Sequence, residues 1–308
     1  MKFNEYLRSC REKNALTQEN LVHDLYSHDI DNFESLDTST LSKWERAVTK
    51  PKVSKQVSII KYFQNKTNVV LPCWDNYSPD EAAGLICKAG MHNLIGNSKK
   101  HIYHYPSEKM SVDDMHIYPL RSFEGFESLI DMHMHLHQNI NHESIQLRKE
   151  QFKEWALHPD SLFLVCEYKD TCLGLSFTTK LKTDIFDKVL NFEMMRSEIT
   201  TEHFASYDEE GSSLMLGFFA LNEKAATLLF IRYYAYLISN QKYIAEIGAV
   251  SNSQEAIKLI SNMNLQYDGS QLTKDNVEIK SYRESLFNVL ASEYVVKMLL
   301  SNQECPEE

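Results

Sequence analysis

The sequence predicts a multidomain chain in which an all-α N-terminal segment is followed by an α/β domain with a mixed sheet. Apolar residues recur at helical spacing through residues 1–65. From Met115 onward, short strand-like runs alternate with helical ones. The length of 308 residues is enough for about two domains. We therefore expect a helical domain at 1–66, a connector with one helix at 67–112, and an α/β domain at 113–308.

The first segment is expected to hold four short helices. Thr17 can cap the second helix and Asp37 the third, because their side-chain oxygens accept hydrogen bonds from first-turn N–H groups. Leu41 and Trp44 then face inward. One apolar stripe per helix cannot be buried alone, so the helices must pack together. The remaining inward residues are Phe3, Leu7, Cys10, Leu21, Val22, Leu25, Val57, Ile60 and Phe63.

Charge is distributed unevenly along the chain. The net charge is −11, yet residues 38–66 hold seven Lys/Arg and one acid, which predicts a local basic surface. Thr38, Ser39, Ser42 and Lys43 would point outward from the third helix. Short hydroxyls and a cation are the composition expected where a helix enters the DNA major groove.

Two stretches, "LTQENL" and "TLSKWERAVTKP", resemble the lambda-repressor-like (Xre/Cro-type) helix-turn-helix family of transcription regulators over roughly residues 3–64. The resemblance implies a sequence-specific DNA-binding regulator that binds double-stranded DNA, and operators with two-fold symmetry predict a homodimer. The expected DNA-binding residues are Gln18, Thr38, Ser39, Thr40, Ser42, Lys43, Arg46, Lys50 and Lys52. A helical module that binds protein instead of DNA is the alternative.

Individual roles follow from the same resemblance. Gln18, Lys50 and Lys52 are expected to contact phosphates, while Ser39 and Lys43 read bases. Independently of the resemblance, Glu45 is expected to make an internal ion pair with a base such as Arg11. Two departures from the family pattern are present. Ala47 stands where the family has Gly, and residues 26–36 lengthen the turn between the second and third helices.

The elements of the second part follow in order. A strand at 115–121 and a helix at 125–140 precede a hairpin of strands 161–168 and 172–181, which turns at Lys169 and Asp170. A buried strand at 213–221 leads into a long helix at 223–240. A strand at 243–250, a helix at 253–264 and a last strand at 276–286 complete the order.

This order resembles the GNAT acetyltransferase family over roughly residues 113–285, with Asn252, Ala256 and Leu259 in approximate places of a late family motif. The family binds acetyl-CoA at a glycine-rich turn. Here the turn "LNEKAATLL" at 221–229 has no glycine, and Glu223 would repel phosphates. The family's tyrosine acid falls near Ile260 or Ser261.

We therefore expect a non-catalytic domain that senses a small molecule or an acyl ligand, or sets dimerisation. No catalytic residue and no cofactor are expected. The alternative is an acyltransferase with an atypical acyl-CoA site fused to a helix-turn-helix. The missing glycine turn disfavours that alternative.

Other patterns indicate little further chemistry. His133 and His137 have i,i+4 spacing, but their helix face supplies no third ligand, so no metal is expected. Cys166 and Cys172 flank the hairpin turn and should point to opposite faces. The six cysteines show no paired spacing, no apolar run reaches about 20 residues, and no signal peptide is apparent. We therefore expect reduced thiols and a cytoplasmic protein.

Overall fold

The structure is a computed structural model, which describes residues 1–87, 110–122, 126–140, 148–273 and 276–300. The chain divides into two compact units. The helical unit contains residues 1–87, 234–242 and 287–300, and the sheet unit contains the described residues of 95–233 and 243–286. The predicted domain limits at 66 and 112 stay a prediction.

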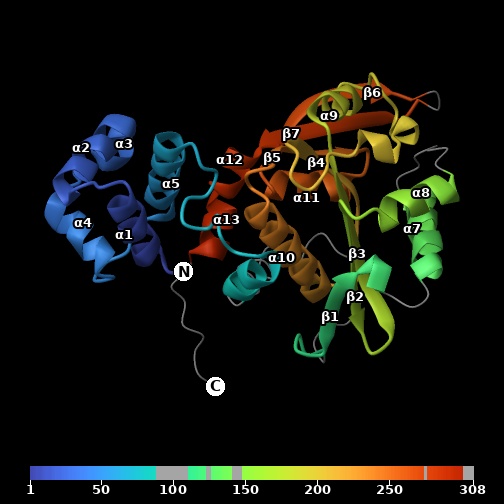
Figure 1. The fold of residues 1–308 in the computed structure, drawn as a ribbon, viewed down its shortest axis with the longest axis horizontal. Helices are drawn as coiled ribbons and strands as arrows, with labels where there is room; N and C mark the ends of the chain where they lie inside the picture. The colour runs from blue at the N-terminus through green and yellow to red at the C-terminus, as the bar shows by residue number, and fades with distance from the viewer. Residues whose placement is uncertain (88–109, 123–125, 141–147, 274–275, 301–308) are drawn as a thin grey trace. The chain divides into compact units, whose positions relative to one another are not determined.

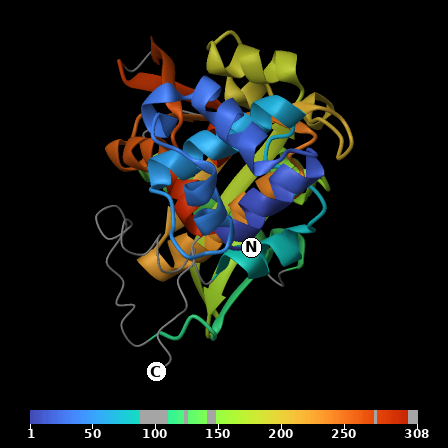
Figure 2. The ribbon, with the colours of Figure 1, turned by 90° about the vertical axis from the view of Figure 1, so that its left-hand side faces the viewer.

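The helical unit begins with five helices, which Figure 2 shows in blue and cyan. They are α1 (Phe3–Lys13), α2 (Gln18–His28), α3 (Ile30–Phe33), α4 (Thr38–Glu45) and α5 (Val53–Thr67). The predicted caps are confirmed: Thr17 accepts a hydrogen bond from the N–H of Asn20, and Asp37 from that of Thr40. The long turn contains α3, which Asp29 caps.

The core of the helical unit includes both residues that α4 was expected to bury. Leu41 and Trp44 are buried, as predicted. A helical stretch also begins at Pro79 and reaches the last described residue, Cys87. From the C-terminal end come α12 (Leu286–Leu290) and α13 (Glu293–Leu299). α13 packs on α5, and the side chain of Gln64 donates a hydrogen bond to the Phe287 carbonyl.

The sheet unit is built on a mixed seven-stranded sheet, which confirms the α/β class of this part. Its strands are β1 (Met115–Pro119), β2 (Ser161–Tyr168), β3 (Thr171–Leu181), β4 (Gly211–Ala220), β5 (Ile244–Ser251), β6 (Gln266–Leu272) and β7 (Glu278–Ser285). The strand order is β1-β2-β3-β4-β5-β7-β6. Every neighbouring pair is antiparallel except β4 and β5, which run parallel.

Helices cover both faces of this sheet (Figure 1). α7 (Phe126–Ile140), α8 (Lys149–Leu157) and α9 (Thr183–Leu190) contribute to the apolar cluster on one face. The first turns of α10 (Glu223–Ser239) form a second cluster on the other face. α11 (Gln254–Asn262) follows β5. The sequence did not predict α8, α9 or β6.

The β2–β3 hairpin turns at the predicted residues. Lys169 and Asp170 both have positive φ, 48° and 61°, as a two-residue type I′ turn requires. A bulge between Cys166 and Glu167 shifts the register, so that Cys166 pairs with Gly174 while Glu167 pairs with Cys172. Cys166 lies in the cluster under α10, whereas Cys172 packs on the opposite cluster, so the two thiols point apart as expected.

Among the described residues, no helix is both long enough and apolar enough to cross a membrane.

Candidate functional site

The parallel strands β4 and β5 pair along only part of their length. β5 pairs with β4 from Gly211 to Met215, and the last pair joins Met215 to Ala249. Beyond it, β4 continues to Ala220 paired with β3 alone, while the end of β5 pairs with β7. The two strands are therefore no longer paired with each other beyond Met215 and Ala249, and we call these unpaired edges the β4–β5 opening.

A bulge in β4 lies at the point where this separation starts. Met215 pairs with Thr178 and Gly217 with Phe177, so Leu216 is the additional residue on β4. A bulge of this kind bends the strand and increases its twist, and bulges are over-represented next to active sites. The bend at Leu216 accounts for the divergence of β4 from β5.

The face of the sheet under α10 carries polar groups beside this opening. The hydroxyls of Ser213 and Tyr233 are 3.2 Å apart and buried. Lys180, opposite Ser213 on β3, is 3% exposed and donates hydrogen bonds to the carbonyls of Tyr207 and Glu209. Burial lowers the pKa of Lys180. Its bonds fix the chain before β4.

A tyrosine lies in register with the end of the β4–β5 pairing. Tyr282 on β7 pairs with Ala249, which pairs with Met215, so the three residues form one row across the sheet. Tyr282 is 6% exposed and its ring packs edge-on against Tyr267. Burial raises the pKa of Tyr282 above its ordinary value, so the phenol stays protonated at neutral pH.

At the start of α10, which follows β4, the chain's own side chains make the polar contacts. The Asn222 side chain accepts a hydrogen bond from the Ala225 N–H at 2.9 Å, as a helix cap does. Lys224 Nζ donates to the Met110 carbonyl at 2.7 Å. Glu223 places a negative charge at this helix end. These residues do not fit a nucleotide diphosphate, which needs free N–H groups and positive charge.

The late helix supplies no tyrosine acid either. On α11, Ile260 is buried, and the Ser261 hydroxyl donates to the Ile257 carbonyl of its own helix. Tyr282 is the residue that sequence reasoning missed. Its strand was predicted, but only the register across three strands brings Tyr282 into line with the opening.

The residues predicted to contact DNA lie on α4 and beside it. The side chains of Thr38, Ser39, Lys43, Arg46, Lys50 and Lys52 are exposed, and those of Thr40 and Ser42 are half-buried. Gln18 instead makes an internal hydrogen bond: its side-chain amide donates to Glu45 Oε2 at 2.7 Å. Glu45 also accepts from Arg11 Nε at 2.5 Å, which confirms the predicted internal ion pair.

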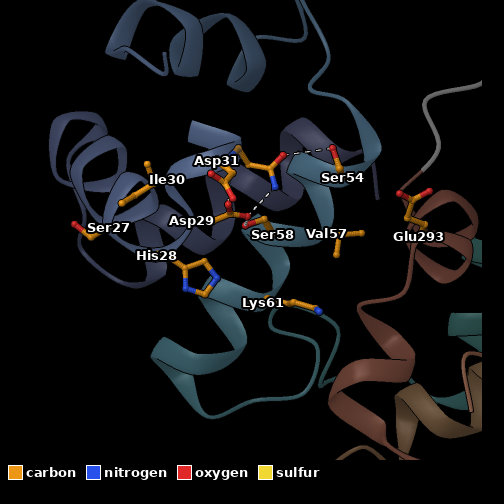
Figure 3. A pocket seen from close by; sticks show the side chains of 11 residues that line it. Ser27, His28, Asp29, Ile30, Asp31, Ser54, Val57, Ser58, Lys61 and Glu293 are labelled. Atoms are coloured by element: carbon orange, nitrogen blue, oxygen red, sulfur yellow. Dashed lines mark hydrogen bonds between the residues drawn. The ribbon is translucent and has the colours of Figure 1, made fainter. Parts of the chain in front are cut away.

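The helical unit also has an open hollow of about 760 Å³ (Figure 3). It is lined by Ser27, His28, Asp29, Ile30, Asp31, Asn32, Ser54, Val57, Ser58, Lys61 and Glu293. The carboxylate of Asp29 is already engaged, since it caps α3 and accepts a hydrogen bond from the Ser58 hydroxyl at 2.7 Å. Asp29 therefore supports the local fold around the hollow.

We also searched the described residues for a metal-binding site. No group of three or more His, Cys, Asp and Glu within them could hold a metal ion. The side chains of His133 and His137 lie outside the described residues.

Comparison with known proteins gives matches in structure only. No family model matches the chain, and no curated protein matches its sequence. FeeM, an N-acyl amino acid synthase from uncultured soil microbes, matches with 10% identity and a TM-score of 0.39, over 56% of this chain and 90% of its own. A GNAT-family acetyltransferase from Streptococcus pneumoniae matches with 11% identity and a TM-score of 0.33, over 56% and 98%.

An acetyltransferase from Streptococcus agalactiae matches with 10% identity and a TM-score of 0.35, again over 56% of this chain and 98% of its own. These likenesses concern the fold alone. The sheet unit itself is a mixed seven-stranded sheet with helices, which is the α/β class that the GNAT resemblance implied.

The same matches correct three predictions. The predictions of a DNA-binding transcription regulator, of a non-enzymatic chain, and of double-stranded DNA as the partner are wrong, because the matched structures are acyl-transferring enzymes. The homodimer prediction rested on a palindromic operator and loses its basis with it. Exposed short hydroxyls and lysines on α4 are a composition that a solvated helix shares with a DNA-reading one, so this pattern alone could not identify the partner.

Proposed function

We propose that the sheet unit is an acyltransferase that holds its acyl donor in the opening between β4 and β5. The observation that carries this proposal is the loss of β4–β5 pairing beyond Met215 and Ala249, at the Leu216 bulge. Separated strand edges offer backbone N–H and C=O groups to an extended chain that contains amides, in the manner of an added strand. The pantetheine arm of acyl thioesters is such a chain.

The donor site is apolar where the acyl arm would run. Phe218 on β4 stacks on Phe230 of α10 with ring centroids 4.6 Å apart, and Ala220, in the same apolar cluster as Phe218, is buried. The start of α10 does not fit the diphosphate of coenzyme A. Recognition therefore rests on the arm and the acyl group, and we infer a donor class of acyl thioesters for which the nucleotide contributes little.

The reaction would be attack by an acceptor nucleophile on the thioester carbonyl, followed by loss of the thiolate. We assign to Tyr282 the donation of a proton to this thiolate, because its phenol is protonated at neutral pH and lies in the row that ends the β4–β5 pairing. A positioned proton donor contributes about 10²–10⁴-fold to rate.

For the helical unit we propose the helix-turn-helix arrangement as a fold only. The Glu45 side chain joins α4 to Arg11 on α1 and to Gln18 on α2, which supports packing of the lambda-repressor type. No nucleic acid is assigned to it.

The test uses the full chain with three donors: acetyl-CoA, a long-chain acyl-CoA and an S-acyl pantetheine. We expect thermal stabilisation by the long acyl donor, with CoA and pantetheine forms bound within a few-fold of each other, and release of free thiol with a panel of amine acceptors. Tyr282→Phe should lower kcat by about 10²-fold. Tyr267→Phe is the matched control, because Tyr267 is exposed and packs on the same ring. Absence of both stabilisation and thiol release with every donor would end the proposal.

A further inference from the structure

Two cysteines that are far apart in the sequence meet in the helical unit. Cys10 on α1 and Cys73, which follows α5, are 63 positions apart, and their Sγ atoms are 3.4 Å from each other. A disulfide has an S–S distance of about 2.05 Å. The two sulfurs are therefore little more than 1 Å farther apart than the sulfurs of a disulfide.

The two thiols differ in exposure. The Cys10 side chain is buried, whereas Cys73 is half-exposed. Cys73 sits between the buried residues Pro72 and Trp74. The chain there is fixed by hydrogen bonds from the Leu71 N–H to the Gln241 side chain and from the Trp74 N–H to the Leu71 carbonyl. Cys73 is therefore held in place against α1 and not carried on a loose loop.

The surroundings of Cys10 and Cys73 shift the pKa values of the two thiols in opposite directions. The hydrogen bond between the two sulfurs, together with Lys13, lowers the pKa of Cys73 to about 7. The same hydrogen bond and burial raise the pKa of Cys10. Tyr6, Lys13 and Asp75 are the other titratable groups facing the pair, and of these Tyr6 is buried with a raised pKa. Cys73 is thus the nucleophilic thiolate near neutral pH, and Cys10 is its resolving partner.

We infer that Cys10 and Cys73 form a reversible intramolecular disulfide, a redox modification site that locks α1 to the segment behind α5. The oxidant is a low-molecular-weight disulfide of the glutathione class. The Cys73 thiolate attacks one sulfur of the oxidant, so that a mixed disulfide forms and one thiol leaves. The Cys10 sulfur then attacks Cys73, gives its proton to the leaving thiolate, and releases the second thiol. Both protein sulfurs are oxidised, and the small disulfide is reduced to two thiols.

Two of the three other described cysteines, Cys166 and Cys172, do not compete for this pairing. Cys166 and Cys172 lie on opposite faces of the sheet, and burial raises the pKa of both thiols. Cys172 therefore serves as the matched control, since it is half-buried like Cys73.

The test equilibrates the full chain in glutathione redox buffers, quenches with acid, blocks free thiols with N-ethylmaleimide, and maps the digest by mass spectrometry without reductant. We expect a peptide pair cross-linked through Cys10 and Cys73, lost on adding dithiothreitol, absent in Cys73→Ser and in Cys10→Ser, and retained in Cys172→Ser. Oxidation of the wild type should raise its melting temperature by about 5 °C or more, because the bond closes a long loop.

Kinetics give a second readout. The rate of cross-linking should rise with pH through about 7, following the Cys73 thiolate. Lys13→Ala should slow it about threefold at pH 6.5, and Lys13→Arg should not. The inference is overturned if Cys73 ends as a stable mixed disulfide with glutathione while Cys10 stays reduced. It is also overturned if both thiols remain free in an oxidising buffer or a different pair is joined.

Discussion

Replacing Glu45 by alanine is the sharpest test of how the helical unit is held together. Glu45 is 3% exposed and accepts three side-chain hydrogen bonds: from Arg11 Nε at 2.5 Å, from Arg11 Nη2 at 3.2 Å, and from the Gln18 amide at 2.7 Å. These contacts join α4 to α1 and α2. The substitution removes the carboxylate that the Arg11 and Gln18 side chains share.

The expected cost follows from what the substitution leaves behind. Breaking a buried ion pair by removing one partner costs about 3–5 kcal/mol, because the remaining charge stays buried without compensation. The Arg11 side chain is 15% exposed, and it keeps a hydrogen bond to the Leu16 carbonyl at 2.9 Å and an ion pair with the exposed Glu12 at 3.5 Å. Partial solvation and these remaining contacts place the expected loss of stability at the lower end, about 3 kcal/mol.

The assay must separate the two units. Native-state hydrogen exchange with mass spectrometry reports the opening free energy of amides in α1 and α4 independently of those in β3 and β4. We expect protection in α1 and α4 to fall by about 3 kcal/mol while protection in the sheet remains unchanged. The control is the double variant Arg11→Met with Glu45→Leu, which removes both charges and should recover most of the loss. A fall below about 1 kcal/mol in Glu45→Ala would refute the reasoning.

Three further predictions concern single positions. Ala47 has φ of 58°, a left-handed conformation that costs an alanine about 1–2 kcal/mol; Ala47→Gly should therefore stabilise the helical unit by a net ~0.5–1 kcal/mol in urea unfolding, after the entropy of glycine is subtracted. Gly248→Ala would place a Cβ 2.6 Å from the Phe186 ring and should cost about 1–3 kcal/mol of stability by thermal unfolding; no loss would mean that α9 can shift. The Tyr62 hydroxyl donates to Asp24 at 2.6 Å and is the largest cause that lowers the pKa of that carboxyl. A carboxyl whose pKa is lowered in the folded state stabilises the fold above its unfolded pKa of about 4, and this stabilisation is lost as the pH falls through the folded-state pKa. Tyr62→Phe should therefore raise the Asp24 pKa in an NMR titration and reduce the loss of stability below pH 4.

Local chemistry made much of the helical unit predictable. Thr17 and Asp37 could be predicted as helix caps because a short side chain with an oxygen, placed just before an apolar helical stripe, can accept a hydrogen bond from a first-turn N–H group. Glu45 is the single acid in the basic stretch 38–66, and it pairs with Arg11 as predicted. α9 could have been predicted as well, since Phe186 and Leu190 are four residues apart on one helix face.

Long-range register made the rest unpredictable. The bulge at Leu216 depends on how β3 and β4 align, and nothing in the residues of β4 fixes that alignment by itself. The contact between Cys10 and Cys73 joins a first helix to a segment behind the fifth, so cysteine spacing along the chain could not reveal it. Tyr282 gains its place only after β5 and β7 have paired.

The error about catalysis has a physical source that bears on the proposed site. A glycine-rich turn at the start of a helix serves phosphate binding, and its absence at 221–229 removes one contribution to donor affinity. Acyl transfer takes place at the thioester, which lies at the far end of the pantetheine arm from the phosphates. The elements that would act there are the separated edges of β4 and β5 and a protonated phenol, and neither depends on the turn. Loss of uniform binding energy raises KM and leaves the chemical step intact. The absence of a glycine-rich, phosphate-binding turn therefore limits which acyl donors such a fold can bind. It does not decide whether the fold can transfer the acyl group of a bound donor.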